Sequence, residues 1–97
     1  MRAIGYESGL LLPTKYLRFE QVDTPPGRKT AVWNVISQSS GAILGTIRWH
    51  GPWRQYTLWP TNGTLYNVEC LTDLADRLAT CNRWHRNIRA NLARAAS

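Results

Sequence analysis

The stretch LGTIRWHGPWRQYTLWP, residues 44–60, carries most of the information about the fold. Three tryptophans and a tyrosine alternate here with two arginines, on either side of Gly51 and Pro52. Aromatic and β-branched residues that flank a Gly/Pro pair are typical of a β-hairpin. We therefore predict strands over 43–50 and 53–59, joined by a reversal at Gly51-Pro52.

Alternation along these strands divides their side chains between two faces of a sheet. In the first strand one face holds Ile43, Ile47 and Trp49, and the other holds Thr46, Arg48 and His50. In the second strand one face holds Trp53, Gln55, Thr57 and Trp59, and the other holds Arg54, Tyr56 and Leu58. These rings either fill a core with Trp33 or form an exposed stacking surface, and Trp53 beside the turn is the ring that we expect to be exposed.

Two further strands are predicted upstream of the hairpin. Residues 16–22 alternate apolar and charged side chains, and the sequence DTPPG at 23–27 ends that strand. Residues 29–37 carry apolar side chains on both faces, which favours a central strand covered by a helix. Residues 1–14 show no sustained period and are predicted to form a loosely structured N-terminal arm.

After the hairpin the apolar pattern changes to helical spacing. Asn67 is a suitable N-cap, and a stripe then recurs at steps of three and four residues through Leu71, Leu74, Leu78, Cys81, His85, Ile88 and Leu92. We predict a helix over 67–94. Its two cysteines, Cys70 and Cys81, would lie about 16 Å apart along the axis, beyond the roughly 7 Å that a disulfide spans between Cα atoms.

Together these elements predict an α+β fold in one domain, residues 1–97. A four-stranded antiparallel sheet in meander order, within residues 16–60, packs one face against one long C-terminal helix. That helix would be about 40 Å long, whereas typical strands span about 17 to 20 Å. Its second half should therefore overhang the sheet, and its apolar stripe would be covered by the N-terminal arm, by a partner or by a second copy in a homodimer.

The charge of the chain favours a polyanionic partner. Ten arginines and two lysines oppose six acidic residues, for a formal net charge of +6. Arg83, Arg86 and Arg94 fall within about 80° of one another on a helical wheel. They form either a phosphate-binding ridge or a solvated face that suits the negative end of the helix.

Signatures of catalysis and of metal binding are missing from the sequence. There is no GxSxG motif, no phosphate-binding glycine loop and no convergent pair of carboxylates. Cys81 and His85 are four residues apart, but two ligands do not complete a metal site. We expect a non-enzyme without metal or cofactor. Two unpaired thiols, no leader and no long apolar span predict a cytoplasmic protein without membrane contact.

At residues 44–60, followed by TLYNVECLTDLADRL at 64–78, the chain resembles small uncharacterised proteins of phages and other mobile elements. The shared pattern is a strand ending in Gly-x-Ile-x-Trp, then an aromatic residue or His, the sequence GPWRQY at 51–56, and a helix entered after Asn67. The resemblance covers about a third of the chain and implies a sheet-plus-helix fold in a mobile-element setting, with no activity to transfer. This chain departs from the pattern at Leu58-Trp59, where paired aromatic rings are common, and in its arginine-rich tail.

Two functions remain open from the sequence. The first is nucleic-acid binding without strong sequence specificity, with DNA favoured over RNA. Its predicted contact residues are Arg48, Trp53, Arg54, Tyr56, Arg83, Arg86 and Arg94. The second is a protein-interaction module, such as a phage-borne inhibitor or regulator of a host complex or an anti-defence protein, with Trp53, Arg54 and Tyr56 as anchors.

Overall fold

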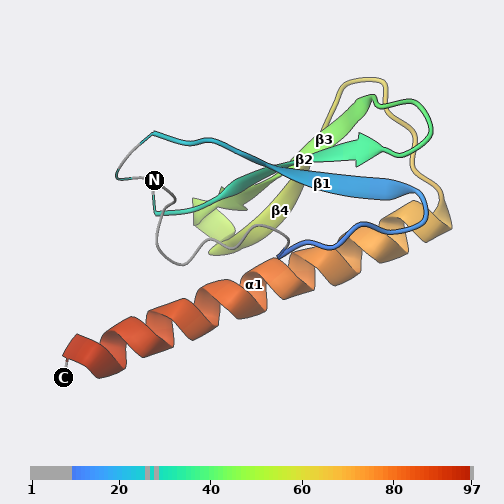
Figure 1. The fold of residues 1–97 in the computed structure, drawn as a ribbon. Coiled ribbons are helices and arrows are strands. Elements are labelled where there is room, and N and C mark those ends of the chain that lie inside the picture. Colours follow the sequence, from blue (N-terminus) through green and yellow to red (C-terminus); the bar gives the residue numbers. More distant parts are fainter. Residues whose placement is uncertain (1–9, 26, 28, 97) are drawn as a thin grey trace.

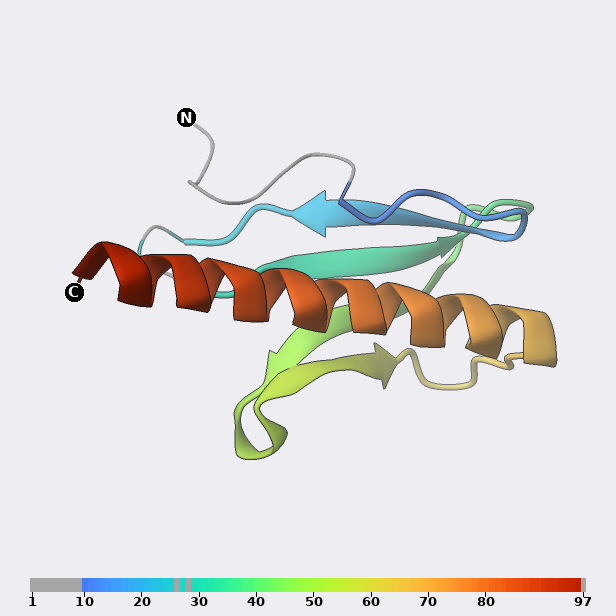
Figure 2. The same ribbon diagram turned by 90° about the horizontal axis from the view of Figure 1, so that it is seen from below.

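The computed structural model describes residues 10–25, 27 and 29–96, so of the predicted arm only residues 10–14 are described. The elements in chain order are β1 (Leu17–Val22), β2 (Val32–Ser37), β3 (Ile43–His50), the 3-10 turn η1 (Gly51–Trp53), β4 (Gln55–Pro60) and α1 (Val68–Ala96). The strands form one antiparallel sheet in the order β1-β2-β3-β4. The helix α1 runs across one face of this sheet (Figures 1 and 2). The predicted α+β meander with a long C-terminal helix is confirmed.

Local sequence signals explain where the elements begin. β4 starts at Gln55, later than expected, because residues 51–53 form η1. α1 starts at Val68 because Asn67 caps it: the Asn67 Oδ1 atom accepts a hydrogen bond of 2.8 Å from the Cys70 amide. This satisfies one of the amides that a helix N-terminus leaves unpaired. The predicted N-cap is confirmed.

A β-bulge corrects the predicted faces of β3. Val35 pairs with Gly45, but Ile36 pairs with Ile43, so the register shifts between these two pairs. Ile43 therefore lies on the opposite face from Ile47 and is exposed, while Leu44 packs against the core. Strict alternation had placed Ile43 on the covered face, which is wrong because a bulge adds a residue to one strand and reverses the alternation beyond it.

The hydrophobic core is one layer between α1 and the covered face of the sheet. Its buried members are Leu11, Leu17, Ala31, Trp33, Val35, Ile47, Tyr56, Leu74 and Cys81. Both cysteines are free thiols, as predicted, and burial raises the pKa of Cys81 to about 12. Cys81 therefore stays protonated and packs as a small apolar side chain.

Arg77 joins the segment before β1 to the helix. Its Nε atom donates a 2.9 Å hydrogen bond to the Leu12 carbonyl oxygen, and its guanidinium pairs with the Asp76 carboxylate. The same guanidinium lies 6.0 Å from the ring centre of Phe19 on β1. Arg77 is thus occupied within the fold.

The length of α1 exceeds that of the sheet. Its 29 residues span about 44 Å, whereas the eight residues of β3 span about 26 Å. The C-terminal end of α1 accordingly extends beyond the strands in Figure 1. The side chain of Leu92 lies outside the described part of the chain, and the homodimer through this helix stays a prediction.

Gly45 sits where no side chain fits. A Cβ atom at this position would lie 2.9 Å from the Trp59 carbonyl oxygen and 3.1 Å from the Tyr66 hydroxyl, which itself donates a 2.5 Å hydrogen bond to the Leu44 carbonyl. Gly45→Ala should cost about 1 to 3 kcal/mol of unfolding free energy, measured by urea denaturation. Gly51→Ala is the matched control, because a Cβ there meets no atom within 4 Å. Equal stability of the two variants would contradict this reasoning.

Candidate nucleic-acid interface

The face of the sheet opposite α1 is not covered by any described element, and polar and aromatic side chains gather at its β3–β4 end. The register pairs Thr46 with Trp59, Arg48 with Thr57 and His50 with Gln55. These pairs alternate with Ile47–Leu58 and Trp49–Tyr56, which face the helix. Alternation therefore places Arg48, His50 and Trp59 on the open face.

Trp59 is the centre of a cluster on this open face. The Arg48 guanidinium lies 4.4 Å from the ring centre of Trp59, within range of a cation–π contact. His50 contacts the same ring edge to face at 5.8 Å and contacts Trp53 at 5.0 Å. We call Arg48, His50, Trp53 and Trp59 the open-face cluster. Trp53 is 66% exposed, whereas Trp59 is 39% exposed and has Arg48 over its ring, so Trp53 is the ring most available to a ligand.

The turn η1 displays Trp53 and Arg54. Pro52 suits the first turn of this short helix, and the Arg54 amide donates a 3.1 Å hydrogen bond back to the Gly51 carbonyl. Arg54 has φ 53° and ψ 46°, the left-handed region, where the other described residues with positive φ are all glycines. A non-glycine residue pays about 1 to 2 kcal/mol there. The exposed Arg54 side chain therefore stands at a position where glycine would be easier to accommodate.

The helix supplies further cations. Arg83 and Arg86 are exposed, as predicted, and within the described residues neither forms an ion pair. The side chain of Arg94 lies outside the described residues. Arg83 and Arg86 belong to the layer behind the sheet, so they do not join the open-face cluster directly.

Tyr56 corrects the predicted contact set. Its side chain is 1% exposed, so it cannot present its ring to a nucleic acid or a protein. Its pairing with Trp49 places it on the covered face, where its hydroxyl accepts a hydrogen bond from the Ala31 amide at 3.2 Å. Its own amide donates to the Asn82 Oδ1 atom on α1 at 2.7 Å. Tyr56 is a core residue that connects β2, β4 and α1.

His50 and Trp59 are the candidate site residues that sequence reasoning did not select. The signal was present, because alternation from Trp49 places His50 on the face opposite the core. Trp59 was assigned to the core in one interpretation, since large aromatic residues are usually buried in a small domain. The structure buries Trp33, as that interpretation expected, but leaves Trp59 on the open face.

The second histidine, His85, belongs to an aromatic layer beneath the helix. Its ring lies 4.3 Å from the Trp49 ring and 6.0 Å from the Tyr56 ring. Burial, and to a lesser degree the positive charge of Arg89, lower the pKa of the His85 imidazole below its usual value. The folded state therefore favours the neutral form of the His85 imidazole over the protonated form.

This lowered pKa predicts a pH-dependent stability. The unfolded chain binds a proton at His85 more readily than the folded chain does. The contribution of His85 to the free energy of unfolding is therefore fully present above the unfolded pKa of about 6.5. It should decline as pH falls from about 7.5 to about 5.5. Urea midpoints across this range test the prediction, and His85→Gln should flatten the decline. An unchanged slope in His85→Gln would contradict the assignment.

Charges are unevenly distributed over the molecule. The acidic residues of α1 are Glu69, Asp73 and Asp76, all in its first half, and Glu20 on β1 pairs with Arg18 at 3.3 Å. No acidic residue occurs in β3, η1, β4 or the second half of α1. The β3–β4 end therefore has a positive potential that carboxylates of its own elements do not offset.

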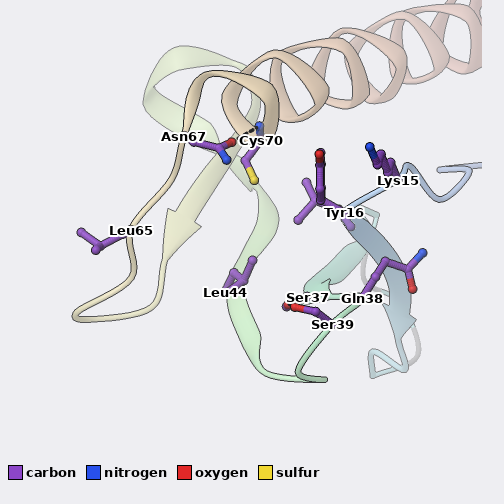
Figure 3. Close-up of a pocket in the computed structure, with 10 residues that line it drawn as sticks. Lys15, Tyr16, Ser37, Gln38, Ser39, Leu44, Leu65, Asn67 and Cys70 are labelled. Carbon is purple, nitrogen blue, oxygen red and sulfur yellow. Dashed lines mark hydrogen bonds between the residues drawn. The ribbon is translucent and has the colours of Figure 1, made fainter.

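A shallow pocket of about 460 Å³ lies at the opposite end of the sheet, beside the start of α1 (Figure 3). It is lined by Lys15, Tyr16, Leu17, Ser37, Gln38, Ser39, Leu44, Leu65, Asn67 and Cys70. Its hydroxyls at Ser37 and Ser39 hydrogen-bond each other, and the Asn67 side chain caps α1. These groups are already used by the fold, so the open-face cluster is the stronger candidate site.

Within residues 10–25, 27 and 29–96, no three His, Cys, Asp or Glu side chains gather closely enough to hold a metal ion. No helix in the described part of the chain combines the length and the apolar character needed to cross a membrane.

Comparison with known proteins identifies a phage relative. Over 61 residues the chain is 34% identical to an uncharacterized 9.3 kDa protein of Acholeplasma phage L2, which covers 63% of this chain and 77% of that protein. No protein-family model matches the chain, and no solved structure matches it. The relative supports the phage setting that the resemblance implies, while the specific hairpin motif stays a prediction.

Proposed function

The chain belongs to the same family as this small phage protein, and we propose that it binds nucleic acid through the open-face cluster and the arginines around it. The role is one of binding rather than catalysis. Phosphates contact the guanidinium groups and bases contact the exposed indole rings.

The observation that carries this proposal is the open-face cluster itself. Neighbouring exposed apolar side chains can mark an interaction site, and here two tryptophans lie beside arginine and histidine on an uncovered sheet face. The Arg48 guanidinium lies over one face of the Trp59 ring, and a guanidinium group can itself contact a phosphate or stack on a base. An apolar protein partner would not require the accompanying concentration of positive charge.

Trp53 provides the direct test of this function. Trp53→Ala should weaken binding of a fluorescent oligonucleotide about 10-fold in anisotropy titrations, since a base stacked on an aromatic ring contributes about 1 to 3 kcal/mol. Leu65→Ala is the control, because Leu65 is also a large exposed apolar residue but lines the pocket at the other end of the sheet. Equal affinities of the two variants would contradict the proposal.

The exposed pair Trp53 and Arg54 also suits a second candidate function, the recognition of a host protein complex. Tryptophan and arginine are the residue types that most often dominate protein interfaces. In that case capture from host lysate survives nuclease treatment, changes little with salt and is lost in Trp53→Ala. Nuclease-sensitive capture instead favours the nucleic-acid function.

A further inference from the structure

We propose that the ligand is a single-stranded nucleic acid, and that its path continues from the open-face cluster over the edge of β4 to Arg86 on α1. This inference builds on the proposed function and names its substrate class. Its chemistry is that of unpaired bases on a phosphate backbone, which single-stranded DNA and single-stranded RNA share.

The exposed rings favour unpaired bases. In a duplex the faces of the bases are stacked on one another, so an indole ring on a protein surface cannot reach them without unstacking. Trp53 offers an exposed ring at the open face, and beside it Trp59 offers the part of its ring that Arg48 and His50 leave uncovered. Bases of a single strand can stack on such rings whatever their sequence.

The edge of β4 brings the two groups of arginines together. β4 is the outer strand of the sheet, and the hydrogen bond from the Tyr56 amide to Asn82 fixes α1 against the beginning of this strand. Arg54 precedes Tyr56 by two residues, and Arg86 follows Asn82 by one helical turn on the same side of the helix. Arg54 and Arg86 therefore lie on either side of one contact, although they belong to different layers.

A continuous line of positive charge results. Arg48 lies on the open face, Arg54 at the edge and Arg86 on the helix layer, and the elements that hold them contain no carboxylate beyond the first half of α1. Figure 1 shows α1 on one side of the sheet, so the open face lies on the other side. A duplex is straight over such a short length because its persistence length is about 150 base pairs, so it contacts one side or the other. A single strand bends around the edge.

The test compares strand type, strand length and one charge. Full-length protein is titrated by anisotropy with oligothymidylate and oligouridylate of about 12 nucleotides, with an oligothymidylate of about 4 nucleotides, and with a duplex of about 12 base pairs. The variant Arg86→Gln is matched with Lys15→Gln, which removes the same charge beside the distant pocket. Both side chains are exposed, so neither change should disturb folding.

We expect the duplex to bind at least about 10-fold more weakly than the longer single strands, and Arg86→Gln to weaken the longer strands about 3- to 5-fold. The short strand should be insensitive to Arg86→Gln, and Lys15→Gln should match wild type on every probe. Duplex affinity equal to or above that of the single strands overturns the inference, as does an Arg86→Gln result no different from Lys15→Gln. The oligothymidylate and oligouridylate arms show which sugar the site prefers. Absence of binding to every probe at low salt rejects the proposed function itself.

Discussion

A Tyr56→Ala variant should lose about 3 to 5 kcal/mol of unfolding free energy, enough to leave a domain of this size largely unfolded at physiological temperature. The ring is fully buried and contacts Trp33 and Trp49 edge to face at 5.7 Å and 5.3 Å. Its removal leaves a cavity between sheet and helix and also deprives the Ala31 amide of its acceptor. Chemical denaturation followed by circular dichroism measures the loss.

Tyr56→Phe separates the two contributions. The phenylalanine ring keeps the packing but leaves the Ala31 amide without the hydroxyl, so its cost should be about 1 to 2 kcal/mol. If Tyr56 were a surface contact residue, as the sequence suggested, Tyr56→Ala would change stability by no more than about 0.5 kcal/mol and would affect binding alone. That outcome would contradict the core assignment.

Raising the salt concentration from about 50 mM to about 200 mM should weaken oligonucleotide binding about 20- to 50-fold, if about three or four phosphates contact arginine side chains. The reason is that each neutralised phosphate releases condensed counterions, and their release becomes less favourable as bulk salt rises. Anisotropy titrations at several salt concentrations give the slope of log affinity against log salt.

The slope can be assigned to particular side chains. Arg48→Gln and Arg54→Gln should each reduce it, because each removes one cation from the β3–β4 end, whereas Lys15→Gln should leave it unchanged. A slope near zero in the wild type would show that phosphate contacts do not contribute, and the protein-interaction function would then be the better account.

The sequence predicted where the helix and the strands lie along the chain better than it predicted on which face of the sheet each side chain lies. Period-two alternation located β3, and the three-four spacing from Leu74 to Ile88 with the Asn67 cap located α1, because such patterns are local. The bulge near Ile43 depends on pairing with β2, which no local pattern records. Alternation continued past the bulge therefore places Ile43 on the wrong face of the sheet.

The candidate site was predicted in part, for a similar reason. Trp53, Arg54, Arg83 and Arg86 are exposed as expected because charge and position beside a turn are local properties. Tyr56 was misassigned, although its alternation with Thr57 and Trp59 was recognised, because the face on which it lies becomes the buried one only when α1 docks. Asn82 could not be foreseen as its partner, since the two residues are far apart in sequence.

The Asn82 contact also reduces the number of free backbone donors along the outer edge of β4. Tyr56, Leu58 and Pro60 of β4 lie opposite Trp49, Ile47 and Gly45 of β3 in pairs that exchange no backbone hydrogen bonds. The backbone polar groups of these three residues therefore point to the outer edge of the sheet. The Tyr56 amide is occupied by Asn82, and Pro60 has no amide hydrogen to donate. Only Leu58 among the three keeps an amide for an incoming strand, so β4 offers few donors for pairing with the edge of another sheet.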